Sequence, residues 1–314
     1  MEAKVKLQFA YGDYANPPIE EDVIYHYCSM ETFYSIVKYG KVRLGDLKSM
    51  NDPSEMRLQE INIGAAILQE YNKNPFDFDI GENGNHYTMK DFLIPSLMEY
   101  NMGRCGKYSN LLFAFCLSTK GNDLSQWRLY GDNGKGVCLG FKKSQIEKFI
   151  KEDKNYSFQQ IEYFKTINEV VSSIAKEILL KIRDMYEQSK VEELKKYKFE
   201  FMHELSKIWS KYKVADYSSE NEVRLVYKLN NNQIFVNVDS KSVKLEDVKD
   251  IDVRLRNGEL SLFKEVPLEK LGLTSVTLGP LNNTIKDSIN IFLAKNNVDI
   301  LSNHIYKSNI PYRA

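Results

Sequence analysis

The segment LSQWRLYGD (124–132) places several side chains suited to ligand recognition within one short stretch. Trp127 offers a flat face for stacking, and Tyr130 offers a hydroxyl group. Gln126 and Arg128 add fixed hydrogen-bond donors, and three glycines follow closely, where backbone can approach a ligand. Two interpretations stay open. The stretch binds a ligand, or Trp127 anchors the core and the glycines only make a turn.

His26 lies inside the apolar run VIYHYCS (23–29), next to Tyr27, and the run precedes a predicted helix. A histidine in such a strand is either a core residue with one satisfied ring nitrogen or a donor to a ligand hydroxyl or phosphate at the strand edge. Tyr27 is a candidate binding residue because it belongs to the same strand.

Glu222 begins the predicted strand NEVRLVYKL (221–229). The two-residue alternation of a strand puts Glu222 and Arg224 on the same face. The two side chains therefore form an internal ion pair, or they make a carboxylate that a neighbouring guanidinium steers. Asn51 and Asp52 precede Pro53 and cap a predicted helix, whose free amides also suit an anion or a ribose.

Arginine is scarce in this chain, with only nine arginines among 43 basic residues. Because the planar guanidinium fork does what lysine cannot, the arginines inside motif-like segments, Arg43 among them, are binding candidates. The histidines have no spacing typical of a metal pair, and we predict no metal site.

The pattern of the chain predicts how these residues are positioned. Strands are expected at 23–29, 41–46, 111–118, 136–141, 159–164 and in a hairpin of 221–229 with 233–238, and helices at 30–38, 53–72, 142–152 and 282–296. Residues 165–212 carry a helical period and predict an inserted helical hairpin. We expect one elaborated α+β domain over 1–314, with a mixed or antiparallel central sheet.

Composition excludes several classes of protein. The 314 residues carry 43 basic and 43 acidic side chains, and this balance argues against a surface coated in positive charge for bulk nucleic-acid binding. No apolar stretch is long enough for a membrane span, and no secretory signal is visible. The four cysteines form no CxxC pair. We therefore expect a reduced, cytoplasmic protein with no membrane partner; the oligomeric state stays open.

Several segments taken in order resemble one bacterial family, the domain of unknown function 2971 (DUF2971). They are YHYCSMETFYSIVKYGKVRLGDLKSMNDPSE (25–55), FAFCLSTKGNDLSQWRLYGDNGKGVCLGF (113–141), SENEVRLVYK (219–228), SVTLGP (275–280) and SNIPYR (308–313).

The opening IYHYCSMETFYSIVKYGKVRL (24–44) also resembles ADP-ribosyltransferase-fold proteins of the His-Tyr-Glu and DarT-like groups. This resemblance implies NAD as substrate, and His26 as the histidine that holds the NAD ribose. Glu222 would be the late glutamate that steers transfer, and Tyr130 the middle aromatic. The resemblance further implies that Arg43 or Asn51 and Asp52 hold substrate.

Three functions follow as hypotheses. The first is an NAD-dependent ADP-ribosyltransferase-like enzyme in a toxin or phage-defence setting, with a nucleic acid or a protein as acceptor. The second is a nucleotide- or nucleic-acid-binding effector without NAD chemistry, in which aromatic residues stack on bases and arginines contact phosphates. The third is a nonenzymatic protein that docks through the helices of 167–212, and it requires an exposed apolar stripe on them.

Overall fold

The structure is a computed structural model. It describes residues 14–18, 20–50, 63–76, 78, 80–82, 85–91, 111–188, 210–229, 248–256 and 258–313. The predicted binding residues Asn51 and Asp52, and the strand expected at 233–238, lie outside these residues.

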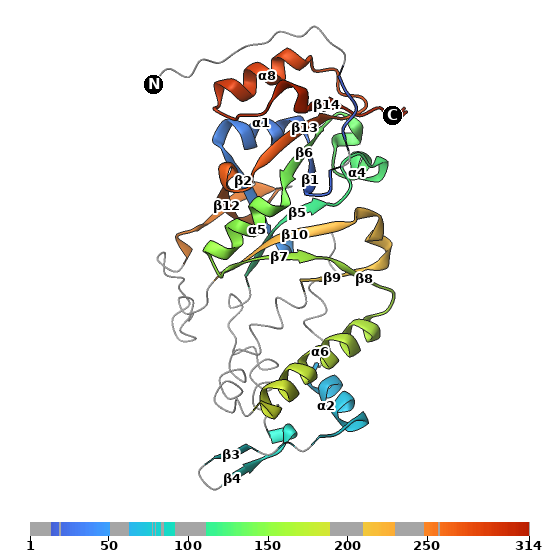
Figure 1. Cartoon of the computed structure of the whole chain (residues 1–314), viewed down its shortest axis with the longest axis vertical. Coiled ribbons are helices and arrows are strands. Elements are labelled where there is room, and N and C mark those ends of the chain that lie inside the picture. Colours follow the sequence, from blue (N-terminus) through green and yellow to red (C-terminus); the bar gives the residue numbers. More distant parts are fainter. Residues whose placement is uncertain are drawn as a thin grey trace.

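A ten-stranded sheet forms the larger part of the described chain (Figure 1). Eight strands follow one another in the order β11 (Ile251–Arg256), β12 (Glu259–Pro267), β2 (Lys41–Asp46), β5 (Leu112–Ser118), β1 (Val23–Cys28), β6 (Val137–Lys142), β13 (Leu273–Leu278) and β14 (Ile305–Lys307). Two more strands, β10 (Glu222–Lys228) and β7 (Tyr156–Gln160), extend from β5. Among the described strands of this sheet, only β13 and β14 pair in parallel, so the predicted mixed or antiparallel sheet is confirmed.

The sheet divides at β5. One edge of β5 pairs with β10 along the whole strand. On the other edge, β2 pairs with Phe113 and Ala114, and β1 pairs only with Ser118. Among the described residues, no strand pairs with this second edge between Ala114 and Ser118. The divergence of β1 from β2 opens a gap over the middle of β5.

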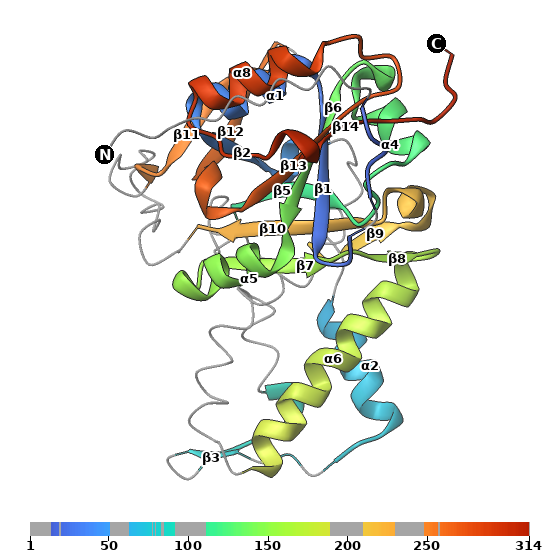
Figure 2. The same cartoon turned by 45° about the horizontal axis from the view of Figure 1, so that its top comes forward.

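Helices cover the sheet and bury its apolar face. They are α1 (Met30–Tyr39), α5 (Lys143–Glu152) and α8 (Lys286–Lys295). In both views α1 and α8 lie side by side (Figures 1 and 2). The rings of Phe33 and Phe292 meet edge to face, with their centres 5.7 Å apart. Ser29 caps α1 by accepting a hydrogen bond from the Thr32 amide, and Gly40 ends it in the left-handed conformation. The sequence predicted a helix at 30–38, and such caps are typical of helix ends.

A second apolar cluster lies away from the sheet (Figures 1 and 2). Here α6 (Ile167–Glu187) packs on α2 (Ile63–Lys73), near the short hairpin of β3 (Ile80–Glu82) and β4 (Asn85–Tyr87). Two short strands, β8 (Glu162–Phe164) and β9 (Tyr212–Val214), form a parallel pair; β8 precedes α6 in the chain and β9 precedes β10. The second helix expected in 165–212 falls on residues outside the described ones, so the described partner of α6 is α2.

The predicted hairpin of 221–229 with 233–238 is wrong. β10 is central, since its two edges pair with β5 and β7, and all seven of its residues are buried. The sequence placed Glu222 and Arg224 on one face, as an internal ion pair or as a carboxylate that the arginine steers. In the structure those polar residues neutralise one another inside the protein, as the site shows.

Candidate functional site

A cleft opens where the sheet divides, and it consists of two adjoining cavities. The inner cavity has a volume of about 200 Å³ and the outer one about 600 Å³. Four residues line both cavities: His26, Tyr27, Tyr130 and Arg256. Glu222 also lines the inner cavity. The three residues proposed for catalysis, His26, Tyr130 and Glu222, therefore line the same cavity.

His26 is fixed in the gap between β1 and β5. Its Nδ1 lies 2.9 Å from the carbonyl oxygen of Cys116, and its ring lies 4.3 Å from that of Phe115. A carbonyl can only accept, so Nδ1 carries the proton. Burial lowers the pKa of His26 to about 4, although the Cys116 carbonyl favours the charged form. The imidazole is therefore neutral at pH 7, with an unprotonated Nε2.

This tautomer corrects one expectation. The sequence suggested His26 as a donor to a ligand hydroxyl or phosphate. With its single proton bonded to Cys116, the ring offers a ligand only an acceptor. A sugar hydroxyl fits such a nitrogen, and a phosphate does not.

Two glutamates enter the inner cavity from one tight turn. Glu220 ends a 3₁₀ turn (Ala215–Glu220), and Glu222 begins β10. Between them Asn221 has φ 46° and ψ 47°, the left-handed conformation that asparagine tolerates better than most residues. This kink lets residues two apart in sequence, at the end of a turn and the start of a strand, line the same cavity.

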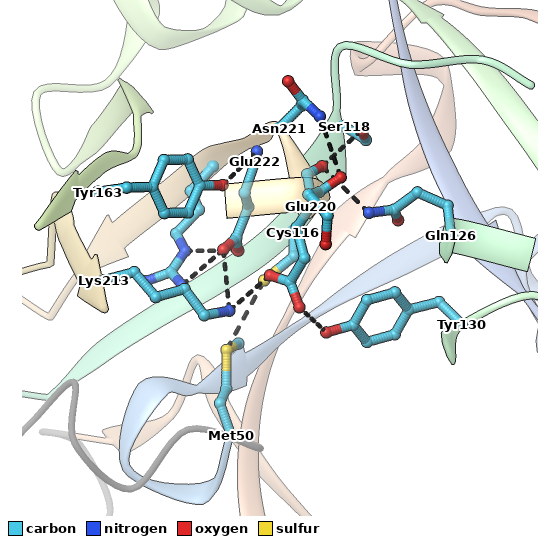
Figure 3. A network of polar contacts seen from close by, with 12 residues as sticks. Met50, Cys116, Ser118, Gln126, Tyr130, Tyr163, Lys213, Glu220, Asn221 and Glu222 are labelled. Carbon is cyan, nitrogen blue, oxygen red and sulfur yellow. Dashed lines mark hydrogen bonds and ion pairs between the residues drawn. The ribbon is translucent and has the colours of Figure 1, made fainter. Parts of the chain in front are cut away.

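The two carboxylates belong to a buried network with two cations (Figure 3). Arg224 holds Glu222 in a two-pronged contact, with Nε at 2.6 Å from Oε1 and Nη2 at 2.9 Å from Oε2. Lys213 bridges the acids, with Nζ at 2.6 Å from Glu220 and 3.2 Å from Glu222. Burial alone would raise the pKa of Glu222, but the charges of Arg224 and Lys213 outweigh it and lower the pKa.

The turn that carries the glutamates is held from three sides. Ser118 Oγ and Gln126 Nε2 both donate to the Glu220 carbonyl oxygen, at 2.7 and 3.1 Å. The Tyr130 hydroxyl donates to Glu220 Oε1 at 2.5 Å, and the Glu222 amide donates to the Tyr163 hydroxyl at 2.8 Å. Burial, and after it the Glu220 carboxylate, raises the pKa of Tyr130. Tyr130 thus stays protonated and acts as a fixed donor.

Some of the remaining predicted residues line a cavity, and others lie in the protein core. Arg43 lines the outer cavity and Arg224 the inner one, as a buried partner of Glu222. Trp127 lines neither cavity. It is fully buried, packs edge to face on Tyr27 at 4.8 Å, and donates from Nε1 to Asn122. Trp127 is therefore a core anchor, one of the two interpretations left open by the sequence.

Arg128 is exposed on α4 (Leu124–Leu129) and lines neither cavity. The hydroxyl of Tyr27 donates to the Lys120 carbonyl and accepts from the Asp123 amide, so it fixes the loop before α4. Burial raises the pKa of Tyr27. Tyr27 contributes to the wall of the cleft and supports α4, whereas Arg128 does neither.

Sequence reasoning missed Glu220, Lys213, Arg254 and Arg256, all of which line a cavity. For Glu220 a signal existed: two glutamates around an asparagine that can turn the chain. Lys213 lies in a strand of only three residues, and nothing in the sequence around it distinguishes it from the other lysines.

The charge of the cleft is uneven. In the inner cavity the acids and the two bases of the network balance, and Arg256 adds a positive charge. The outer cavity is lined by four basic side chains (Lys41, Arg43, Arg254, Arg256) and two acidic ones (Glu31, Glu265). In a chain of zero net charge this is a local positive field. Within the described ranges, no three His, Cys, Asp or Glu residues gather closely enough to hold a metal ion.

Comparison with known proteins gives one match. The family model for DUF2971, described as a protein of unknown function, matches residues 126–225, from Gln126 in the inner wall to Leu225 in β10. The match confirms the DUF2971 resemblance that the sequence motifs indicated. No curated protein and no solved structure matches the chain. Where the chain is described, none of its helices has both the length and the apolar character needed to cross a membrane.

Proposed function

We propose that the protein binds NAD⁺ in this cleft and transfers its ADP-ribose group to an acceptor. The observation that carries the proposal is that His26, Tyr130 and Glu222, from three distant parts of the chain, line one inner cavity. The volumes agree with a ligand of this type. The inner cavity is smaller than the 300–1,000 Å³ of ordinary ligand sites, whereas the outer one falls within that range. A two-part ligand suits the pair.

The contacts suit a ribose in the inner cavity. Nε2 of His26 accepts from one sugar hydroxyl. The carboxylate of Glu222 accepts from another, because each of its two oxygens has two lone pairs and can accept a bond beside the one from Arg224. The tyrosine rings of the shared wall offer apolar faces to an aromatic leaving group.

The reaction breaks the bond between ribose C1′ and the ring nitrogen of nicotinamide. The bonding electrons leave with nicotinamide, which becomes neutral, and positive charge develops on the sugar. A lone pair of the acceptor then forms the new bond to C1′, and the acceptor's proton passes to water. Glu222 keeps its negative charge because Arg224 and Lys213 lower its pKa. Since they also fix its position, the carboxylate needs no rearrangement as the charge develops.

The third hypothesis, a docking surface on the long helices, finds no support on α6. Its apolar residues Val170, Ile174 and Ile178 are buried against α2, and among large apolar side chains of α6 only Ile167 and Leu180 are exposed. These two are isolated from each other by nearly four turns. They make no continuous stripe.

Calorimetric titration of NAD⁺ into the purified protein tests the binding half of the proposal. We expect saturable binding that weakens at least tenfold in His26→Ala, because the ribose loses an acceptor. Arg128→Gln is the matched control on the exposed side of α4 and should bind as wild type does. Absence of saturable binding, or equal affinity in His26→Ala and wild type, would contradict the proposal.

A further inference from the structure

Three of the nine arginines meet on one face of the sheet at the outer cavity. Arg254 pairs with Ser261 across β11 and β12, and Arg43 pairs with Glu265 across β2 and β12. Because residues opposite each other share a face, and positions two apart do too, Arg43, Arg254 and Arg256 point the same way. Phe263 lies between them, with the guanidinium carbons of Arg43 and Arg254 at 4.5 and 5.8 Å from its ring centre.

Among the described residues, Glu265 is the only acid that forms an ion pair with this cluster. Glu265 is shared by Lys41 at 2.8 Å and Arg43 at 3.4 Å. No described carboxylate lies within ion-pair distance of Arg254 or Arg256, and the contact found for Arg256 is a hydrogen bond to the Ser49 carbonyl. Burial and then the charges of Arg256 and Arg43 lower the pKa of Arg254. Holding these groups together is costly without an anion.

A second observation points to the same place. In the part of the chain that the structure describes, only two buried side-chain polar atoms have no hydrogen-bond partner, Arg254 Nε and Ser261 Oγ. Their residues face each other across β11 and β12. Buried polar atoms are nearly always satisfied, and an orphan marks a missing partner. Both atoms can donate a hydrogen bond; Arg254 lines the outer cavity, and Ser261, on the neighbouring strand, does not.

We infer that Arg43, Arg254 and Arg256 form a binding site for a phosphate group, with Ser261 opposite Arg254 on the neighbouring strand. A phosphate has several acceptor oxygens, accepts two parallel bonds from a guanidinium, and carries the charge that the cluster lacks. Arg256 lines both cavities, so a phosphate held here lies beside the entrance to the inner one. The inference rests on the proposed function for the ligand's sugar end. The phosphate belongs either to the diphosphate of a free nucleotide or to a nucleic-acid strand.

The melting temperatures of variants at Arg254 and Ser261 distinguish a binding role of these residues from a structural one. Arg254→Gln removes repulsion, and Ser261→Ala removes an unsatisfied buried hydroxyl. Neither variant should lower the melting temperature of the ligand-free protein. Both should weaken anion binding. A residue kept only for structure would behave in the opposite way.

Titration with inorganic pyrophosphate, which has no sugar or nicotinamide, tests the site directly. We expect wild type, Glu222→Gln and Arg128→Gln to bind it with similar affinity, Arg254→Gln and Arg256→Gln at least tenfold more weakly, and Ser261→Ala severalfold more weakly. Arg254→Lys should recover only part of the affinity, because lysine keeps the charge but not the fork. Failure of wild type to bind, or unchanged binding in Arg254→Gln, would overturn the inference.

Competition identifies the source of the phosphate. Displacement of pyrophosphate by ADP-ribose, and not by a ten-nucleotide single-stranded DNA, assigns the site to a free nucleotide. Displacement by the oligonucleotide, with affinity that falls steeply with salt, assigns it to a nucleic acid. Failure of the proposed NAD⁺ cleavage would leave pyrophosphate binding intact, so the two failures are distinguishable.

Discussion

Breaking the pair of Arg224 and Glu222 should cost far more stability than breaking an exposed pair of the same length. Arg224 Nε lies 2.6 Å from Glu222 Oε1 with the two side chains 1% and 5% exposed. Arg183 Nε lies 2.6 Å from Glu187 Oε1 on α6, with 47% and 57% exposed. Arg224→Met keeps most of the volume but leaves a buried carboxylate with Lys213 alone. Arg183→Met is the matched control.

Breaking a buried ion pair costs about 3–5 kcal/mol, and an exposed pair less than about 1 kcal/mol. For a chain of 314 residues, an unfolding entropy of roughly 2 cal/mol/K per residue converts 1 kcal/mol into about 1.5 °C. Arg224→Met should therefore melt roughly 5–8 °C below wild type, and Arg183→Met within about 2 °C. Differential scanning calorimetry at pH 7 measures both.

The pH dependence gives the same experiment a second readout. The folded pKa of Glu222 is lowered, so its contribution is present above the unfolded pKa of glutamate and is lost as pH falls through the folded value. The gap between wild type and Arg224→Met should shrink in acid. In Arg224→Met combined with Glu222→Gln, much of the loss should return, because no buried charge is left unpaired. A melting point for Arg224→Met equal to that of Arg183→Met would refute the reasoning.

Three further predictions concern single positions. The lowered pKa of His26, about 4, means that wild type loses stability as pH falls from the ordinary histidine value of 6.5 towards 4; this slope should be reduced in His26→Gln, and NMR of the imidazole should give the low pKa directly. Asn221→Val should destabilise the protein by about 1–2 kcal/mol in urea unfolding, since a β-branched residue resists positive φ, whereas Asn221→Gly should stay near wild type. Gly121→Ala should lower the melting temperature, because a Cβ there would lie 2.5 Å from the Tyr25 ring. Gly258→Ala has open space around the new Cβ and would add only the backbone strain of an alanine at φ 85°.

Local signals predicted the elements of the fold well. The Ser29 cap, the Gly40 terminus and the buried strand at 112–118 all carry their cause within a few residues. The place of β10 could not be read in the same way. The sequence offered an internal pair of Arg224 and Glu222, which the structure has, but the pairing of β10 with β5 depends on a segment about a hundred residues away.

The candidate site was predicted only in part for a related reason. His26 and Glu222 carry recognisable patterns, yet what brings them together is β5, which pairs with β1 at one edge and β10 at the other. Glu220 belongs to a 3₁₀ turn that Asn221 joins to β10 in the left-handed conformation, so the strand pattern of 221–229 does not include it. Arg254 reaches the cleft through the register of β11 with β12, and Trp127 is withdrawn from it by packing on Tyr27.

The central claim is that Glu222 serves the cleavage of NAD⁺ in the inner cavity. Release of nicotinamide from NAD⁺, followed by chromatography for wild type, Glu222→Gln and the control Arg128→Gln, tests it most directly. Calorimetry on the same samples verifies that Glu222→Gln still binds NAD⁺. We predict release by wild type and by Arg128→Gln, and a loss of at least a hundredfold in Glu222→Gln. No release by wild type, or equal release by Glu222→Gln, would contradict the account.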